Sequence, residues 1–568
     1  MVRRIGIPLF VCALGGSAAA CSGSNAGPSP LASCKTTSAV ATHITLAVGQ
    51  YVSLDPATDS GCVLFPANAS STNQAEYLLV PQSATGDTAQ VAPFQLTSGA
   101  LSAARMPAAQ RFAGPPSPRA TALAFDAYRR GLARRQAAAG GVSPLVAAAP
   151  LPAAATAPQP AGPPVLGSLR TFTVCANLLC GGPGGKTTRV TAKVTTVGQH
   201  IAIYVDTAAP KPGLDSADLD TLKTVFDARL FPLDTAAFGQ PTDVDTNGVV
   251  LVLMASAVNS LVTSAACKAT GFVAGFFFSP DLDTSATATT YNRGEIFYSI
   301  VADSAGTLSC VHTRAELKRE LGGTFTHELQ HMINFGQHAI LRPGTPEDGW
   351  LDEGLSKYAE ELAGRSYLQQ GDTATFSSYA INDVYDAYQY LSATGDSPLL
   401  ISIDQGTLAE IGASWLFVRY LVDQYGDTLP RKLVRTPLFG GPNVAAQTGQ
   451  PFPTTLTRWA LANWVSDLQG FATPAELTYT SWHFRSRTFP SLNAQDPTHF
   501  PLPYPLVPAQ SAGTAVNVSG SIRSGSGVYA RVLQDASAPG FALAFSSNGS
   551  VAPFPTTVGA RLNVIRIR

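Results

Sequence analysis

Two histidines and a glutamate lie within five residues, in the stretch His327-Glu328-Leu329-Gln330-His331. On an α-helix, side chains four residues apart lie on one face, so both imidazoles can reach one metal ion. A catalytic zinc ion needs three protein ligands and an open position, and a nearby carboxylate can take a proton from water. The spacing therefore predicts zinc ligands at His327 and His331 and a general base at Glu328. Two histidines packed on a helix face are the alternative.

A third ligand must come from another element. A continuing helix would place His338 roughly 10 Å from His331, too far to share the ion. Residues 350–360 have the apolar spacing of a second helix, and Glu353 lies near its start. The connection, 336–349, contains two prolines and several glycines, which turn the chain back and let the helices lie antiparallel. Glu353 would then face the two histidines.

The sequence around these ligands resembles the gluzincins, zinc peptidases in which a Glu on a later helix completes a site of two His and one Glu. The stretches 326–335 (THELQHMINF) and 350–356 (WLDEGLS) are most similar to the hyicolysin family. The close resemblance covers about residues 320–365. It implies a zincin-like metallopeptidase domain that binds zinc and cleaves protein or peptide substrates.

One departure from the related thermolysin branch concerns Lys357. That branch has an aspartate four residues after its ligand Glu, where the Asp orients a zinc-bound histidine, but Lys357 stands at this offset from Glu353. Asp352 or Glu360 could orient a ligand histidine instead, because zinc-bound imidazoles usually donate their second N–H to a carboxylate or carbonyl. A solvated helix face is the alternative for both acids.

The elements that must position the motif follow an α+β pattern, with β-strands before the active-site helix and a helical lobe after it. That helix is predicted from Thr313, where Thr313 and Glu316 form a capping box, to about Phe335, and Gly322-Gly323 can interrupt it. The main elements predicted from the apolar periodicity are strands at 190–197, 201–206, 249–254, 271–278, 295–301, 528–533 and 562–567, and helices at 215–230, 411–425 and 456–468. The stretch 294–298 is either an edge strand that pairs with an extended peptide or an ordinary internal strand.

Composition shifts divide the chain into six segments. They are a signal peptide at 1–20, a tether after a lipidated cysteine at 21–33, an N-terminal β module at 34–100, an Ala/Pro-rich linker or pro-segment at 101–167 with a short basic helical patch at 125–136, a zinc metallopeptidase domain at 168–495 with its helical lobe from about 366, and a C-terminal β module at 505–568. The zincin-like domain is thus expected between two small all-β modules.

The first twenty residues have the layout of an export signal: a basic start, an apolar run from Ile5 to Leu14, and small residues before Cys21. Ala18-Ala19-Ala20-Cys21 resembles a bacterial lipobox, which predicts lipidation at Cys21 and a cell-envelope lipoprotein. Simple secretion after cleavage near Ala20 is the alternative. No transmembrane helix is expected after residue 20, so a membrane would be reached only through the lipid.

Six cysteines remain beyond Cys12 and Cys21, and an even number in an exported chain favours disulfides. Nearest-neighbour pairing gives three bridges: Cys34 with Cys62, Cys175 with Cys180, and Cys267 with Cys310. A cysteine-based zinc site is the alternative, but no Cys-x-x-Cys pair occurs.

The charge balance excludes one class of partner. Lys+Arg number 37 and Asp+Glu 38, so no excess of positive charge would draw the chain to nucleic acid. Charged residues make up 13% of the chain, against about 25% in ordinary soluble domains, so much of the surface must be small and neutral. The composition leaves the oligomeric state undetermined.

A second candidate metal site is the loop Asp243-Val-Asp245-Thr-Asn247-Gly248, which has the oxygen spacing of a calcium loop. Met254 stands at the closing position, where an EF-hand needs Glu. A hydrogen-bonded Asx turn leading into the next strand is the alternative to calcium.

These observations predict an exported zinc-dependent endopeptidase. The alternative is a cell-surface binding lipoprotein with a non-catalytic zincin scaffold. A transition-state donor is not fixed by spacing: Tyr379, Tyr385 and His483 lie downstream of the motif, and ordinary packing or surface positions explain each of them.

Overall fold

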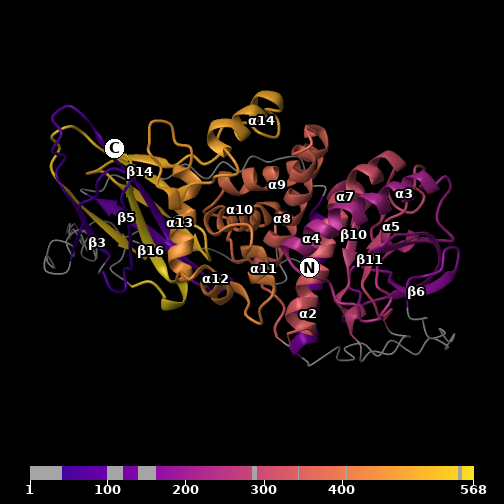
Figure 1. Ribbon diagram of the computed structural model, residues 1–568. Helices are drawn as coiled ribbons and strands as arrows, with labels where there is room; N and C mark the ends of the chain where they lie inside the picture. The colour runs from indigo at the N-terminus through magenta and orange to yellow at the C-terminus, as the bar shows by residue number, and fades with distance from the viewer. Residues whose placement is uncertain are drawn as a thin grey trace, which may run out of the picture.

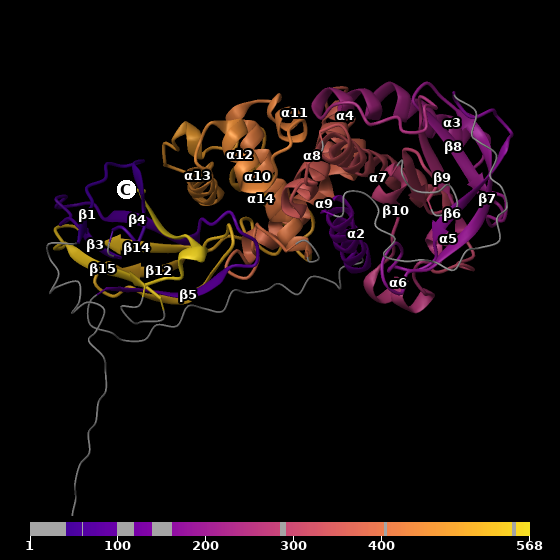
Figure 2. The same ribbon diagram turned by 90° about the horizontal axis from the view of Figure 1, so that it is seen from below.

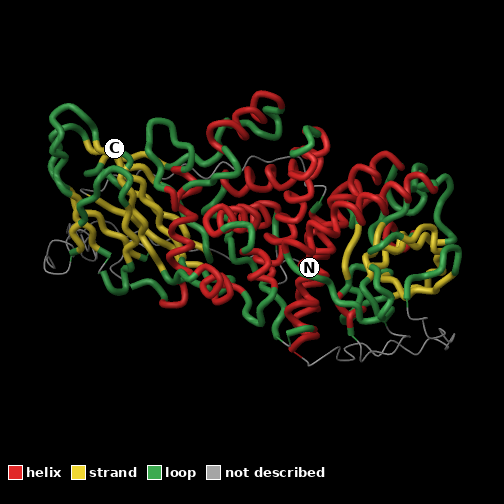
Figure 3. The backbone as a smooth tube through the Cα atoms, viewed as in Figure 1, coloured by secondary structure: helices red, strands yellow, loops and turns green. Residues whose placement is uncertain are grey.

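The computed structural model has three parts in a row: a β-sandwich at one end, a block of helices, and a mixed sheet with its covering helices at the other (Figure 1, Figure 3). The structure describes residues 41–59, 61–98, 119–138, 162–283, 291–342, 344–402, 406–547 and 553–568. The expected α+β class is confirmed. The predicted signal peptide, the tether and Cys21 lie outside the described residues. Among the described helices, none combines the length and apolar character needed to cross a bilayer.

The mixed sheet positions the candidate site. It has six strands in the order β10-β11-β9-β8-β7-β6. Their bounds are β6 Leu169–Cys175, β7 Thr187–Val197, β8 Ile201–Asp206, β9 Val250–Met254, β10 Gly275–Phe277 and β11 Ile296–Ser299. All five residues of β9 are apolar and buried, as expected for a strand with parallel neighbours on both sides and covered faces. The stretch 294–298 lies mainly in the internal strand β11, and β10 is the edge strand next to it.

Helices cover this sheet and build the adjoining helical block. Their bounds are α3 Ser216–Val225, α4 Phe231–Ala237, α5 Ser256–Asn259, α6 Ser264–Thr270, α7 Arg314–Phe335, α8 Gly349–Leu368, α9 Thr373–Ser392, α10 Leu408–Tyr425, α11 Leu429–Val434, α12 Gly440–Thr448, α13 Phe452–Val465 and α14 Phe489–Gln495. The capping box between Thr313 and Glu316 is present at the start of α7. Gly322-Gly323 does not interrupt this helix. A Cβ on Gly322 would lie 2.0 Å from the hydroxyl of Tyr379, so glycine there allows α9 to approach α7 closely.

The two terminal β segments, expected as separate modules, form one sandwich of two five-stranded sheets. The sheet orders are β1-β3-β15-β5-β13 and β12-β14-β4-β16-β2, from strands β1 Thr42–His43, β2 Tyr51–Leu54, β3 Cys62–Phe65, β4 Ala75–Ser83, β5 Val91–Ser98, β12 Ala509–Ala512, β13 Asn517–Arg523, β14 Ala530–Gln534, β15 Phe541–Ser546 and β16 Ala560–Arg566. Leu79 and Leu96 share one core with Val532 and Val564, and all four are fully buried. Neither terminal segment alone has enough strands to cover its apolar face, so pairing the two buries both.

The Ala/Pro-rich segment 101–167 contains helix α2, Ala120–Ala138, which includes the basic helical patch expected at 125–136 and is longer than it. This helix lies between the mixed sheet and the helical block (Figure 2). Phe125 and Leu132 are buried in the large core that runs through both of these parts. The segment predicted as a linker or pro-segment thus contributes a packed helix. The few apolar side chains of this helix pack against other elements of the protein.

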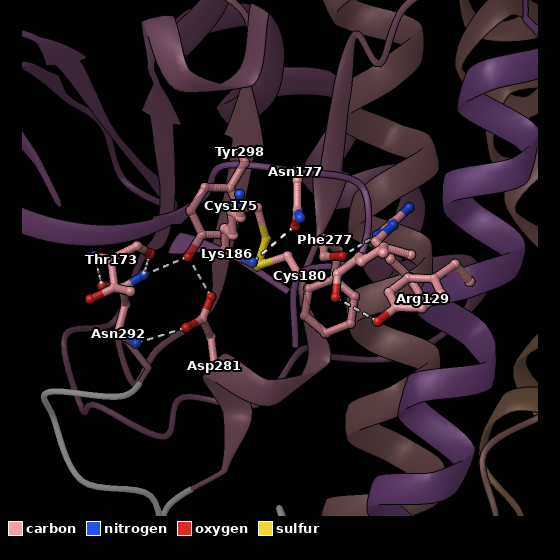
Figure 4. Close-up of a disulfide and its surroundings, with 12 residues drawn as sticks. Arg129, Thr173, Cys175, Asn177, Cys180, Lys186, Phe277, Asp281, Asn292 and Tyr298 are labelled. Atoms are coloured by element: carbon pink, nitrogen blue, oxygen red, sulfur yellow. Dashed lines mark hydrogen bonds between the residues drawn. A yellow bond between two sulfur atoms is a disulfide. The ribbon is translucent and has the colours of Figure 1, made fainter. Parts of the chain in front are cut away.

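Two predicted disulfides are confirmed, Cys175–Cys180 and Cys267–Cys310. The first closes the loop that follows β6, against which α2 packs (Figure 4). The predicted partner of Cys62, Cys34, lies outside the described residues.

Candidate metal centre

Helices α7 and α8 bring His327, His331 and Glu353 together, with one ligand atom of each lying within 4.8 Å of the others. The two Nε2 atoms are 3.1 Å apart, and the Glu353 carboxylate oxygens lie 3.8 Å from His327 Nε2 and 3.7 Å from His331 Nε2. Ligands about 2 Å from a tetrahedral zinc ion are separated by roughly 3.3 Å. The spacing and the N/O donor set therefore fit a zinc ion held by three protein ligands.

Each histidine is oriented by its own carboxylate on α8. His327 Nδ1 lies 2.8 Å from Glu360 Oε1, and His331 Nδ1 lies 2.9 Å from Asp352 Oδ2. Both rings therefore turn Nε2 toward Glu353. The contacts run in opposite order along the two helices, which makes α7 and α8 antiparallel.

Lys357 stands four residues after Glu353, where the thermolysin branch has an aspartate. Its side chain supports this arrangement. Its ammonium group lies 2.7 Å from Glu360 and 3.4 Å from Asp383. Burial opposes ionisation of Glu360, but Lys357 and His327 outweigh it and hold the pKa of Glu360 at about 2. The carboxylate that faces His327 therefore stays charged over the working pH range. The carboxylate beside His327 thus comes from Glu360, seven residues after Glu353, and Lys357 lies beside it.

The His331 side of the site is also strongly acidic. Burial disfavours the charged imidazole, but Asp352 and then Glu353 outweigh burial and raise the pKa of His331 to about 9. Burial likewise opposes ionisation of Asp352, and His331 outweighs it, so the pKa of Asp352 lies below its ordinary value. Asn334 holds the other oxygen of Asp352. Such concentrated negative charge suits a divalent cation.

Glu328 lies next to the ligands and is held by the edge strand of the sheet. Its Oε2 accepts a hydrogen bond of 2.8 Å from the backbone N–H of Phe277, at the end of β10. The side chain is buried, so its carboxylate has a fixed direction. A base held in this way beside the metal ligands can exchange protons with water or substrate at the site.

Helix α2 forms one wall of a cavity beside His331, Asp352 and Glu353. The cavity is lined by Asp126, Arg129, Arg130, Ala133, Phe277, Ser279, His331, Asn334, Phe335, Pro346, Glu347, Asp352 and Glu353. Arg130 pairs with Glu353, and an Arg129 nitrogen lies 3.5 Å from Glu328 Oε2. These arginines belong to the basic patch seen in the sequence, but that pattern did not connect them with the motif almost two hundred residues later.

The chain is similar in sequence to a metalloprotease. The chain is 26% identical over 220 residues to "Neutral metalloprotease ShpI" from Staphylococcus hyicus. It resembles a metallopeptidase. The match covers 37% of this chain and 44% of the relative, so the chain spans less than half the length of that protein. No family model matches the sequence.

Other residues considered from the sequence lie away from this metallopeptidase-like centre. His338 is fully buried, with Nε2 3.9 Å from Glu347. Tyr379 packs against α7 at Gly322, and Tyr385 packs against Phe500. None of these three lines the cavity in front of the ligands. The exposed His483 also lies outside that lining and contacts Asp467 at 3.2 Å.

The predicted calcium loop folds as a hydrogen-bonded turn. Asp243 Oδ1 accepts the backbone N–H of Asn247, and Asp245 Oδ2 accepts the Asn247 side-chain amide at 2.7 Å. Asn247 Oδ1 accepts the N–H of Val249 as the chain enters β9. Glu295, which the sequence did not single out, lies near the two aspartates. The contacts match the Asx-turn alternative, and calcium has no support.

Proposed function

We propose that this protein is a zinc-dependent endopeptidase of the gluzincin type, most similar to the hyicolysin family, and that its zincin-like domain hydrolyses peptide bonds in protein or peptide substrates. The observation that carries the proposal is the convergence of His327, His331 and Glu353 with Glu328 beside them. The similarity to a neutral metalloprotease supports the same chemistry. A binding scaffold would have no need for a base beside the ligands.

The proposed roles follow from the contacts of each side chain. Bound zinc would supply the Lewis acidity that activates water and polarises a carbonyl. Glu328 takes the proton from water and delivers it to the leaving amine, and the Phe277 N–H keeps its carboxylate in place. Asp352 and Glu360 keep the histidine rings turned toward the metal position.

The proposal is tested by replacing the base while keeping the ligands. The Glu328→Gln variant is expected to retain about one zinc per chain and to lose casein hydrolysis by roughly 100-fold or more. Zinc is measured by elemental analysis and hydrolysis by release of soluble peptides. Chelation of zinc should abolish the activity of the parent.

Because α2 covers the site, the parent and the Glu328→Gln chain are also compared in an Arg129→Ala, Arg130→Ala background. Equal hydrolysis by the chains with and without Glu328, or no hydrolysis by any zinc-loaded chain, would contradict the proposed peptidase. A preparation without zinc at His327, His331 and Glu353 would contradict the metal site itself.

We further propose that the protein is exported through residues 1–20 and anchored by lipid on Cys21. The basic, apolar and small-residue order of this segment supports the proposal. Mass spectrometry of the mature protein should find a diacylglycerol-modified Cys21 as its first residue. An unmodified N-terminus near Ala20 would indicate simple secretion instead.

A further inference from the structure

Helix α2 and its preceding residue carry an unusual density of positive charge. Residues 119–138 contain five arginines and one aspartate, whereas the whole chain has 37 Lys+Arg and 38 Asp+Glu. Four of the arginines pair with acids on α7, α8 with its N-cap residue, and α9; these helices and β10 form the walls of the space around α2, here called the cleft. The pairs are Arg119 with Asp386 at 2.5 Å, Arg129 with Glu328 at 3.5 Å, Arg130 with Glu353, and Arg134 with Asp348. The helix and the cleft are therefore complementary in charge along most of the helix length.

Two of these pairs involve the groups assigned to catalysis. Arg130 takes one oxygen of Glu353, the proposed third ligand, and Arg129 reaches the proposed base Glu328. Both guanidinium groups are largely buried, with side-chain exposures of 9%. Solvent screens the attraction in such buried arginine–carboxylate contacts little, and removing one partner would leave a buried charge unpaired.

Helix α2 also contacts β10, the edge strand that borders the site. Arg129 donates a hydrogen bond to the backbone carbonyl of Phe277 in β10, the residue whose N–H holds Glu328 (Figure 4). The exposed side of an edge strand is where an extended peptide would pair with the sheet. Through Arg129, α2 therefore contacts both the strand edge and the base beside it.

Apolar and polar contacts fix the helix to the strand side of the cleft. Phe125 packs edge-to-face on Phe276 with ring centroids 5.2 Å apart. The Tyr128 hydroxyl donates to the Leu179 carbonyl at 2.6 Å, in the loop closed by the Cys175–Cys180 disulfide. The acids Asp348 and Asp386 hold the helix from the other side. The helix thus bridges both walls of the cleft.

We infer that the cleft is a binding site for an arginine-bearing segment and that α2 fills it within the same chain, closing the catalytic groups to substrate until the helix is displaced or cut away. This inference rests on the proposed peptidase function for its consequence, but the binding itself does not require turnover. The flanks 101–118 and 139–161 are rich in Ala and Pro, so cleavage within them would separate the helix from the chain.

The test uses the full chain with a recognition sequence for a site-specific protease placed in each Ala/Pro-rich flank. The zinc-loaded protein is cut, and α2 is removed by gel filtration at high salt. A fluorescent synthetic peptide of residues 119–138 is expected to bind the cut chain saturably and to leave the uncut chain unbound. A peptide carrying Arg129→Ala and Arg130→Ala should bind at least about tenfold more weakly. The matched control is a peptide with Arg135→Ala, because Arg135 is exposed on the same helix, and it should bind like the parent.

Access to the site gives two further readouts. Loss of zinc to a coloured chelator and hydrolysis of casein should both become at least about tenfold faster after cutting. If the chain unfolds without α2, as seen by circular dichroism, the same rise is expected in the uncut Arg129→Ala, Arg130→Ala variant. Equal peptide binding by the parent and the double-alanine peptide, or unchanged zinc loss on opening the site, would overturn the inference. Peptide binding and faster zinc loss without casein hydrolysis would support the inference while contradicting the proposed peptidase.

Discussion

At the scale of single residues, the centre depends on carboxylates that do not contact the proposed metal position. Asp352 and Glu360 lie beside the Nδ1 atoms of His331 and His327, and each is in turn held by a neighbour, Asn334 or Lys357. A ring held this way is fixed in tautomer and direction before it binds metal. Such supporting groups commonly change metal affinity by about 10–100-fold.

We therefore expect Asp352→Asn and Glu360→Gln each to weaken zinc affinity by about 10–100-fold while the fold stays intact. The amide keeps the size of the carboxylate but removes the charge that favours an imidazole N–H donor. Competition with a chelator of known affinity measures the change. Glu320→Gln is the matched control on α7, because Glu320 is exposed and its carboxylate pairs with the exposed Arg319 at 3.5 Å. Zinc affinities equal to that of this control would exclude the orienting role.

At the scale of the elements, α7 is positioned by close packing rather than by helix propensity. Two adjacent glycines would weaken an isolated helix, yet α7 runs unbroken through Gly322 and Gly323. Gly322 faces the hydroxyl of Tyr379, whereas the nearest atom to a Cβ on Gly323 would be 3.9 Å away. There is therefore no room for a side chain at position 322, whereas position 323 can accept one.

This difference predicts opposite effects of the same substitution. Gly322→Ala should lower the free energy of unfolding by about 1–3 kcal/mol, because the buried Tyr379 must move. Gly323→Ala should be neutral or stabilising by up to about 1 kcal/mol, because alanine favours the helix and its methyl group meets no close atom. Urea denaturation of the two variants measures both values. Equal destabilisation by both would contradict the proposed close contact between α7 and α9.

At the scale of the whole molecule, the two ends of the chain build one domain. β13 pairs with β5, and β4 lies between β14 and β16. The sandwich also contacts the helical block, where the Tyr529 hydroxyl donates to the Ala460 carbonyl at 2.7 Å. The residues of the candidate site thus lie, in sequence, between the two segments that form the sandwich.

Removal of residues 505–568 should therefore expose the backbone of the N-terminal strands as well. Amide hydrogens in β4 and β5 are expected to lose their protection against exchange, because their partner strands are gone. Strands β7, β8 and β9 belong to the six-stranded sheet, none of whose strands is removed, and should keep their protection, which makes them the internal control. Retained protection in β4 and β5 would show that the N-terminal segment folds alone.

The motif itself was predictable because its geometry is local. Four-residue spacing on a helix brings His327 and His331 to one face whatever surrounds them, and the capping box fixes where α7 begins. Apolar periodicity likewise predicted β7 to β9, α10 and α13 near their observed bounds. The placement of Glu353 beside the histidines needed one more step, the reversal of the chain between α7 and α8.

The remaining features depended on contacts between segments far apart in the sequence. Sequence periodicity shows that a strand has an apolar face but not which strand covers it. The sandwich shared by the two terminal segments could therefore not be predicted from the sequence. The same holds for the basic patch in α2: four arginines specify a positive charge, but only the tertiary structure places Arg129 and Arg130 against Glu328 and Glu353. By itself the sequence determined that His327 and His331 share one helix face, because residues four apart on a helix have a fixed geometry. The tertiary structure decided what faces them, because long-range pairing depends on how all the apolar surfaces are buried together.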